Sequence, residues 1–326
     1  MDTRNIVNKF ERDLQVVRLE GDAVGPGETI RHAISLPFDF IAIKLVATCF
    51  RVGTPVEGFG LESVGDPPLL VKLNMAGTDV DREPAPMRAL WGSAKFPTIL
   101  PNPYPLRKGD LISVEIQSKQ VAATGQMFPV FTLIGYRPTR TQLQKMRDAV
   151  NALYLRPYQT TVAKPSQGNG QVTTVTFPAN TRGDLYVANL SFDFVISKFV
   201  GSVFEIDAVG TYPVAEQNPS VFNQLESKSQ LIDTQDEPFR NMFGNGENPN
   251  IINPPMVMRS GDEIRVFAKQ YTQIVPANVV PYYVFSGCVP VAAEMDRLEQ
   301  MRGQMRGDLI VPDPITRMRG GNVVKR

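Results

Sequence analysis

Two short segments carry carboxylates at the close spacing that acid–base or metal chemistry can use. A glycosidase needs two carboxylates at a set separation, and a divalent cation needs several oxygen ligands. Because both segments also contain proline, we interpret them as solvated loops rather than as a site. The carboxylates are Asp79, Asp81 and Glu83 in the first segment and Asp233, Asp236 and Glu237 in the second.

The sequence offers few side chains for nucleophilic or metal-assisted catalysis. His32 is the only histidine, so a histidine-ligated metal cluster is excluded and a Ser-His-Asp triad would have to use this residue. Cys49 and Cys288 lie in apolar stretches and are expected to be buried free thiols. The glycines at 58–60 and 244–246 are not followed by the Lys-Ser/Thr of a phosphate-binding loop. The sequence therefore predicts no catalytic residue, no metal site, no cofactor and no small-molecule substrate.

Two aromatic residues raise the question of ligand binding. Trp91 and Phe243 each precede a glycine in corresponding stretches of sequence. An exposed aromatic side chain at such a place could stack on a sugar ring or a base, whereas a buried one would belong to the core. We expect the core role and keep ligand stacking as the alternative hypothesis.

The end of the chain is basic and suggests a different kind of contact. Arg317, Arg319, Lys325 and Arg326 lie among few acidic residues. Such a cluster could bind nucleic acid or form ion pairs with a neighbouring subunit. The whole chain has a net charge of only +1, which gives no general attraction to nucleic acid or to an anionic membrane.

The elements that must position these residues are duplicated. The stretch FDFIAIK at 38–44 recurs as FDFVISK at 192–198, an offset of 154 residues (192 − 38). Farther along, RKGDLI at 107–112 matches RSGDEI at 259–264, an offset of 152 (259 − 107). Matches in the same order at nearly constant offset indicate two copies of one domain.

The two-residue change of offset can be placed from shorter matches. Glu83-Pro84 aligns with Glu237-Pro238 at the larger offset, and RALWG at 88–92 aligns with RNMFG at 240–244 at the smaller one. These matches predict that the length difference lies between Pro84 and Arg88.

Each copy has the pattern of short strands joined by turns. Ile112, Val114 and Ile116 alternate with polar residues, as in a strand with one buried face, and Ile264 begins the matching strand of the second copy. Gly-Asp pairs before these strands predict turns, and the proline-rich stretches at 101–105 and 254–255 predict connections. The pattern predicts an all-β fold of two tandem β-sandwich or jelly-roll domains.

Each copy is expected to end in a short amphipathic helix. Leu143, Met146 and Val150 follow at helical spacing within 139–155, and Thr139 with Gln142 forms a capping box. After the second copy, a stripe of Met295, Leu298, Met301 and Met305 predicts the equivalent helix. We expect an N-terminal arm at 1–14, a first sandwich with helix at 15–155, a linker at 156–175, a second sandwich with helix at 176–306 and a C-terminal arm at 307–326.

Targeting signals are not apparent in the sequence. The first residues, MDTRN, contain no apolar segment, which predicts no secretory signal, and no long apolar run predicts a membrane-spanning helix. We expect the protein to be made and folded in a host cytoplasm.

The duplicated pattern resembles that of viral structural proteins. With PFDFIAIK, NPYPLRKGDLISVEI and FTLIGYRP, the tandem copies resemble β-sandwich structural proteins of bacteriophage virions and the double-jelly-roll coat proteins of viruses. The resemblance covers both copies and implies a capsid or head-associated subunit, located in the virion, that self-associates as a trimer or higher oligomer. A helix after each copy would also suit a decoration, fibre or tail component.

Three functions remain open from the sequence. The first is a non-enzymatic structural subunit of a virus particle, a homo-oligomer that assembles through sandwich faces and terminal arms. The second is a carbohydrate- or receptor-binding accessory or tail protein, and the third is a polysaccharide-acting enzyme that uses the acidic loops.

Overall fold

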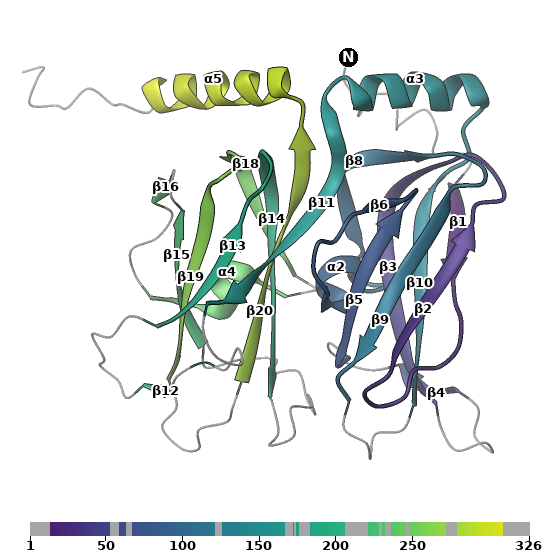
Figure 1. Ribbon diagram of the computed structural model, residues 1–326, viewed down its shortest axis with the longest axis horizontal. Coiled ribbons are helices and arrows are strands. Elements are labelled where there is room, and N and C mark those ends of the chain that lie inside the picture. Colours follow the sequence, from purple (N-terminus) through teal and green to yellow (C-terminus); the bar gives the residue numbers. More distant parts are fainter. Residues whose placement is uncertain are drawn as a thin grey trace, which may run out of the picture.

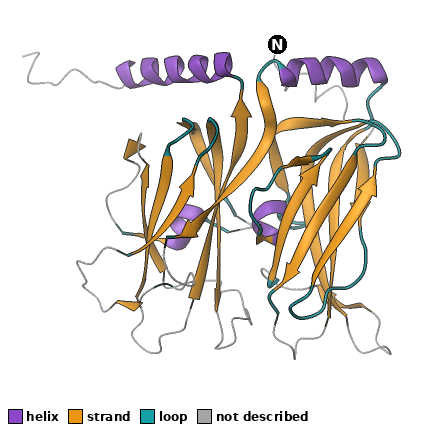
Figure 2. Cartoon of the chain, viewed as in Figure 1, coloured by secondary structure: helices purple, strands orange, loops and turns teal. Residues whose placement is uncertain are grey.

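Alternating apolar and polar side chains form strands along most of the chain, and the strands build two sandwiches that stand side by side (Figure 1). The computed structural model describes residues 14–52, 59–62, 67–120, 126–166, 172, 174–175, 183–205, 221–227, 230–231, 236–245, 248–271 and 279–308. Figure 2 shows that strands make up both sandwiches and that a long helix lies across the same end of each.

The first sandwich is a jelly roll. In its described residues the strands are β1 (Leu14–Leu19), β2 (Thr29–Ser35), β3 (Phe40–Val52), β4 (Phe59–Glu62), β5 (Leu69–Met75), β6 (Thr78–Asp79), β7 (Ala85–Pro86), β8 (Thr98–Leu106), β9 (Leu111–Ser118) and β10 (Gln126–Tyr136). One sheet has the order β1-β10-β3-β8, and the other has the order β2-β9-β5-β7. All these pairs are antiparallel, and this order of eight strands is the double Greek key of a jelly roll.

The second sandwich repeats the order of these eight strands. Its described strands are β11 (Tyr154–Pro165), β12 (Thr174–Val175), β13 (Asp184–Asn189), β14 (Phe194–Glu205), β15 (Val221–Ser227), β16 (Gln230–Leu231), β17 (Glu237–Pro238), β18 (Asn250–Met258), β19 (Glu263–Tyr271) and β20 (Val279–Pro290). The orders are β11-β20-β14-β18 and β13-β19-β15-β17. The expected fold class is confirmed, and the duplication extends to the order of strands.

Part of the expected linker is strand. Residues 156–165 belong to β11, whose end at Lys164 and Pro165 pairs with β13 while the rest pairs with β20. The prediction missed this strand because its outward positions carry Thr160 and other side chains that do not alternate clearly between polar and apolar.

The two helices expected after the copies are α3 (Arg140–Asn151) and α5 (Ala292–Asp308). The described residues also contain two short helices that were not expected, α2 (Met87–Trp91) and α4 (Phe239–Phe243). The capping box of Thr139 and Gln142 starts α3, which ends earlier than expected because β11 begins at Tyr154. The stripe of α3 packs on Ile41, and Met295 of α5 packs on the equivalent Val195. Leu298 and Met301 are half-buried, while the side chain of Met305 lies outside the described residues.

The turns before β9 and β19 are built alike. Gly109 and Gly261 have φ values of 91° and 88°, a left-handed conformation that glycine adopts without strain. Asp110 and Asp262 each accept a hydrogen bond from the backbone N–H three residues earlier. The proline-rich stretches expected as connections are in fact the strands β8 and β18. Both are edge strands, where proline is tolerated because its missing backbone N–H can face solvent instead of a neighbouring strand.

The two jelly rolls share a hydrophobic core. Tyr158, Val162, Val200 and Val284 belong to the second sandwich but pack into the core of the first. A second core lies inside the second sandwich. The two copies therefore form one packed unit rather than separate beads. In the part of the chain that the structure describes, no helix has the length and apolarity to cross a bilayer.

Candidate functional site

The two aromatic residues considered for ligand stacking lie in the core. Trp91 and Phe243 are both 0% exposed. The Trp91 ring centroid is 4.9 Å from that of Phe131, and the Phe243 ring centroid is 4.8 Å from that of Tyr283. The stacking hypothesis was wrong, because no ligand can reach either ring without opening a sandwich.

The acidic residues of the first segment do not gather into a site. Asp79 on β6 accepts hydrogen bonds from Lys72 and Asn74, which lower its pKa. Asp81 is 1% exposed, and Glu83 forms an ion pair with Lys164 of the second sandwich.

The second acidic segment is likewise dispersed where it is described. Asp236 forms an ion pair with Lys269, and Glu237 is in β17. Asp233 lies outside the described residues. Asp79 does act electrostatically on Asp81, but Asp81 is buried and bonded to Leu73 and Thr160, so this pair is closed to a substrate.

The remaining candidate residues have structural positions or lie outside the described ranges. His32 is buried on β2, and burial lowers its pKa. Cys49 and Cys288 are free and buried, as expected. Within the described ranges, no three His, Cys, Asp or Glu side chains are placed to hold a metal ion. The basic cluster of Arg317, Arg319, Lys325 and Arg326 lies outside the described residues.

The structure brings together residues from the two jelly rolls that no local pattern had connected. We call residues 80–91 with β8 the inserting edge, and the outward side chains of β11 (Tyr158, Thr160 and Val162) the receiving face. The Thr160 backbone N–H donates to the Val80 carbonyl at 3.0 Å, and β8 lies beside β11. The contact between inserting edge and receiving face is the joint of the molecule.

Asp81 is the polar centre of the joint. Its carboxylate accepts a hydrogen bond from the Leu73 N–H at 2.7 Å and another from the Thr160 hydroxyl. Burial raises the pKa of Asp81 to about 7, although these two hydrogen bonds favour the ionised form. Asp81 thus links β5 of one sandwich to β11 of the other.

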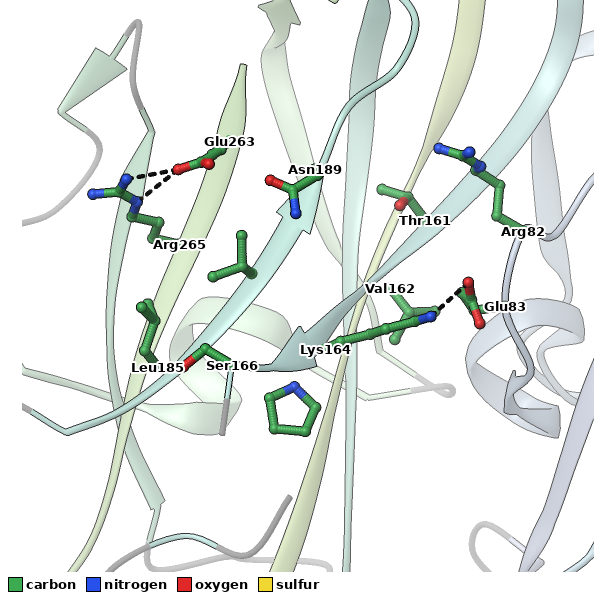
Figure 3. Close-up of a pocket in the computed structure, with 12 residues that line it drawn as sticks. Arg82, Glu83, Thr161, Val162, Lys164, Ser166, Leu185, Asn189, Glu263 and Arg265 are labelled. Carbon is green, nitrogen blue, oxygen red and sulfur yellow. Dashed lines mark hydrogen bonds and ion pairs between the residues drawn. The ribbon is translucent and has the colours of Figure 1, made fainter. Parts of the chain in front are cut away.

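A charged cleft of about 640 Å³ lies along one side of the joint (Figure 3). Figure 3 shows Lys164 reaching across the cleft to Glu83, a contact of 2.7 Å between the two sandwiches. On the other wall Arg265 pairs with Glu263 at 2.6 Å. The Lys164–Glu83 pair thus joins the two sandwiches across the cleft, whereas the Arg265–Glu263 pair lies within β19.

Both halves of the joint recur, uncovered, at the other sides of the molecule. Gln15 pairs with Gly135 as Gln159 pairs with Gly287, so Val16 of β1 corresponds to Thr160 of β11. Val16 is 56% exposed, whereas Thr160 is 0% exposed. We call the outward residues Leu14, Val16 and Arg18 the open receiving face.

The counterpart of the inserting edge is also open. We call residues 236–243 with β18 the open inserting edge. Ala89 on α2 is 1% exposed, but the equivalent Asn241 on α4 is exposed. Ala85 is fully buried, but Glu237 is half-buried. At these two positions the second sandwich thus exposes surface that the first one buries.

The structure also corrects the sequence alignment of the two copies. β7 (Ala85–Pro86) pairs with β5, β17 (Glu237–Pro238) pairs with the equivalent β15, and each stands directly before a short helix. Glu237-Pro238 therefore corresponds to Ala85-Pro86, not to Glu83-Pro84. The offset between the copies is therefore already 152 (237 − 85) at β7, and the length difference lies before this strand. The identical Glu-Pro letters had displaced the sequence alignment by two residues.

Comparison with known proteins gives similarity of structure but not of sequence. No protein-family model and no curated protein sequence matches the chain. The major capsid protein of Sulfolobus turreted icosahedral virus is similar at a TM-score of 0.42 and 9% identity, covering 87% of this chain and 99% of that one. Peptide-N-glycosidase F of Flavobacterium meningosepticum is similar at a TM-score of 0.37 and 11% identity, covering 85% and 99%. At such scores neither likeness assigns a function.

Proposed function

We propose that the protein is a non-enzymatic structural subunit of a virus particle, a capsid or head-associated protein that assembles with copies of itself. The observation that carries the proposal is the reuse of the joint. One receiving face is covered within the chain, and its counterpart on β1 exposes Leu14 and Val16, each 56% exposed. Apolar side chains that are covered at one place and open at the equivalent place mark an interaction surface.

The arrangement of the open surfaces favours a head-to-tail contact. The open receiving face belongs to the first jelly roll, and the open inserting edge belongs to the second. The second jelly roll of a neighbouring chain would contact β1 of this chain. This contact would repeat the one that the first jelly roll makes with β11 inside the chain. Such heterologous contacts form a closed ring when the rotation permits, which supports a trimer or higher oligomer.

The shape of the unit supports a place in a shell. Both jelly rolls stand upright with α3 and α5 across the same end (Figure 1). A ring of such units would have one helix-covered face and one opposite face, as a shell with an inside and an outside requires. The tandem copies and their resemblance to double-jelly-roll coat proteins favour the virion, after synthesis in a host cytoplasm.

The C-terminal arm is proposed as a second contact of the assembly. Arg317, Arg319, Lys325 and Arg326 would pair with acidic residues of a neighbouring subunit or with nucleic acid. Burial of Trp91 and Phe243 removes the observation that favoured a carbohydrate-binding accessory protein.

Light scattering on the purified chain tests the proposal. We expect a mass of at least three times 36.1 kDa for the wild type, and dissociation to 36.1 kDa for Val16→Lys, which places a charge on the open receiving face. Leu111→Lys is the matched control, since Leu111 is 45% exposed on β9, away from both open surfaces. A wild type that stays monomeric at every concentration, or a Val16→Lys variant that assembles normally, would contradict the proposal.

A further inference from the structure

A second groove lies between the sheet β1-β10-β3-β8 of the first jelly roll and the sheet β11-β20-β14-β18 of the second. It is separate from the charged cleft. It has a volume of about 990 Å³, which lies within the range of small-molecule sites. Residues of β8, β14, β18 and β20 form its sides, and α5 contributes at the helix-bearing end. Its walls are largely apolar and include Ile99, Leu100, Tyr136, Tyr154, Val195 and Leu298.

The groove is built from equivalent parts of the two copies. Ile99 pairs with Lys44 in the first jelly roll, and Ile251 pairs with Lys198 in the second, next to the same irregularity in strand register. The two isoleucines are 67% and 64% exposed. Two large aliphatic side chains thus face solvent at the edge of a single groove.

Lys198 differs from its equivalent because the joint buries it. Lys44 is half-buried, whereas Lys198 is 7% exposed. Its ammonium donates to the Thr98 hydroxyl at 3.3 Å, and no ion pair to Lys198 exists among the described residues. Burial lowers the pKa of Lys198 to about 8, which leaves it largely protonated at neutral pH.

The one carboxylate that lines the groove is already paired. Glu294 on α5 accepts two hydrogen bonds from Arg297, at 2.6 and 2.7 Å. With Lys44 and Lys198 on its walls, the groove keeps a positive charge that no described acidic side chain balances. A charge in an apolar groove favours a ligand of opposite sign.

Two buried hydroxyl groups lie beside Lys198 in the wall of the groove. Tyr158 and Ser286 are each 1% exposed and line the groove. Ser286 acts on the pKa of Tyr158 as a hydrogen-bond partner, so the two hydroxyls interact with each other, but the contact lacks normal hydrogen-bond geometry. Buried polar groups in proteins are nearly always well paired, so this poor contact leaves hydrogen-bonding capacity for a ligand in the groove.

We propose that this groove binds a single-chain anionic amphiphile, an alkyl chain with a carboxylate head. The carboxylate would accept hydrogen bonds from Lys198, Tyr158 and Ser286, because an oxyanion can take several donors at once. The alkyl chain would lie along Ile99 and Ile251, which removes both from water. Lys198, Tyr158 and Ser286 lie outside both open surfaces, so binding of the carboxylate head does not depend on the proposed assembly.

Fluorescence titration with 11-(dansylamino)undecanoate at pH 7 tests the proposal. We expect saturable binding, competition by palmitate and no competition by hexadecanol, which has the same chain without the charge. Lys198→Met should weaken binding about tenfold, since it removes a charge-assisted hydrogen bond. Lys44→Met, the equivalent change at the half-buried lysine, should weaken it less than about threefold. Hexadecyl phosphate distinguishes a phosphate head from a carboxylate.

Further measurements keep the test decisive. If Lys198→Met lowers the melting temperature too far, Ser286→Ala and the exposed Ile99→Ser should each weaken binding in a folded protein. Equal competition by hexadecanol, unchanged binding by Lys198→Met, or a preference for hexadecyl phosphate would overturn the carboxylate site. Displacement by a peptide of residues 309–326 but not by palmitate would also overturn it. Light scattering on the same variants separates the result from the assembly proposal, because the groove variants should keep the wild-type mass.

Discussion

The two jelly rolls have the same strand order but bury different surfaces, and the difference shows which surfaces the joint covers. On the inserting edge of the first jelly roll the joint covers Ala89, while the same position of the second is the exposed Asn241. On β11 the joint covers Thr160, while β1 exposes Val16. The exposed apolar Val16 supports the proposed contact outside the chain, since a strand that always faces water is usually made polar.

Core positions behave in the opposite way, because each sandwich must fill its own interior. Trp91 and Phe243 differ in size, yet both are fully buried and both pack on aromatic rings. Equivalent positions are thus of two kinds. Core positions are buried in both copies, whereas positions of the joint are buried only in the copy whose surface the other copy covers.

The largest expected effect comes from the shared core positions. Trp91→Ala and Phe243→Ala should each lower the free energy of unfolding by about 3–5 kcal/mol, because each leaves a large cavity. Phe96→Ala is the matched control, since Phe96 is 39% exposed and should cost far less. Urea unfolding followed by circular dichroism measures all three. A small effect at Trp91 or Phe243 would restore a surface role for that residue.

A smaller effect should separate the two inserting edges. Ala89→Asp places an unpaired charge in the joint and should cost about 3 kcal/mol, whereas Asn241→Asp at the exposed equivalent should change stability by less than about 0.5 kcal/mol. Urea unfolding at a concentration where the chain is monomeric gives both values. Equal costs at the two positions would mean that the joint does not distinguish the copies.

The joint should also respond to pH through Asp81. Because its pKa is raised to about 7 from an ordinary value of 3.8, the folded protein holds this proton more tightly than the unfolded chain. The contribution to stability is therefore fully present below about pH 4 and is lost as pH rises through about 7, a total change of about 4 kcal/mol. Lys72 and Asp79 are the charged groups that act on Asp81 in opposite directions.

Unfolding of the wild type and of Asp81→Asn between pH 5 and pH 8 measures this contribution. The wild type should lose stability relative to Asp81→Asn as pH rises, and Asp236→Asn should follow the wild type. Parallel curves for wild type and Asp81→Asn would show that this carboxyl does not titrate in the joint.

The sequence predicted what local patterns and repetition can encode. Strand alternation, the Gly109 and Gly261 turns and the capping box of Thr139 depend on neighbours in the chain, and these predictions are confirmed. The duplication was visible because the same local solutions recur. The identical Glu-Pro letters of the two copies nevertheless misled the alignment, since only strand pairing shows which residues are equivalent.

The joint and the groove could not be predicted from the sequence. Asp81 meets Thr160 across 79 residues of sequence, and Lys198 meets Thr98 across 100. Burial of Asp81 and Lys198 comes from packing between the two sandwiches, which no local pattern reveals. The segment that contains Asp81 was interpreted as a solvated loop for this reason, because its acidic residues and proline are typical of exposed turns.

Chemical crosslinking between chains tests the reuse of the joint most directly. A chain with Val16→Cys and Asn241→Cys, treated with a short bismaleimide, should give a ladder of covalent multimers of the 36.1 kDa chain, since each chain offers one open receiving face and one open inserting edge. Either substitution alone should give no ladder. If Val16→Cys alone crosslinks as efficiently as the double variant, β1 meets β1 of another chain and the head-to-tail account is wrong.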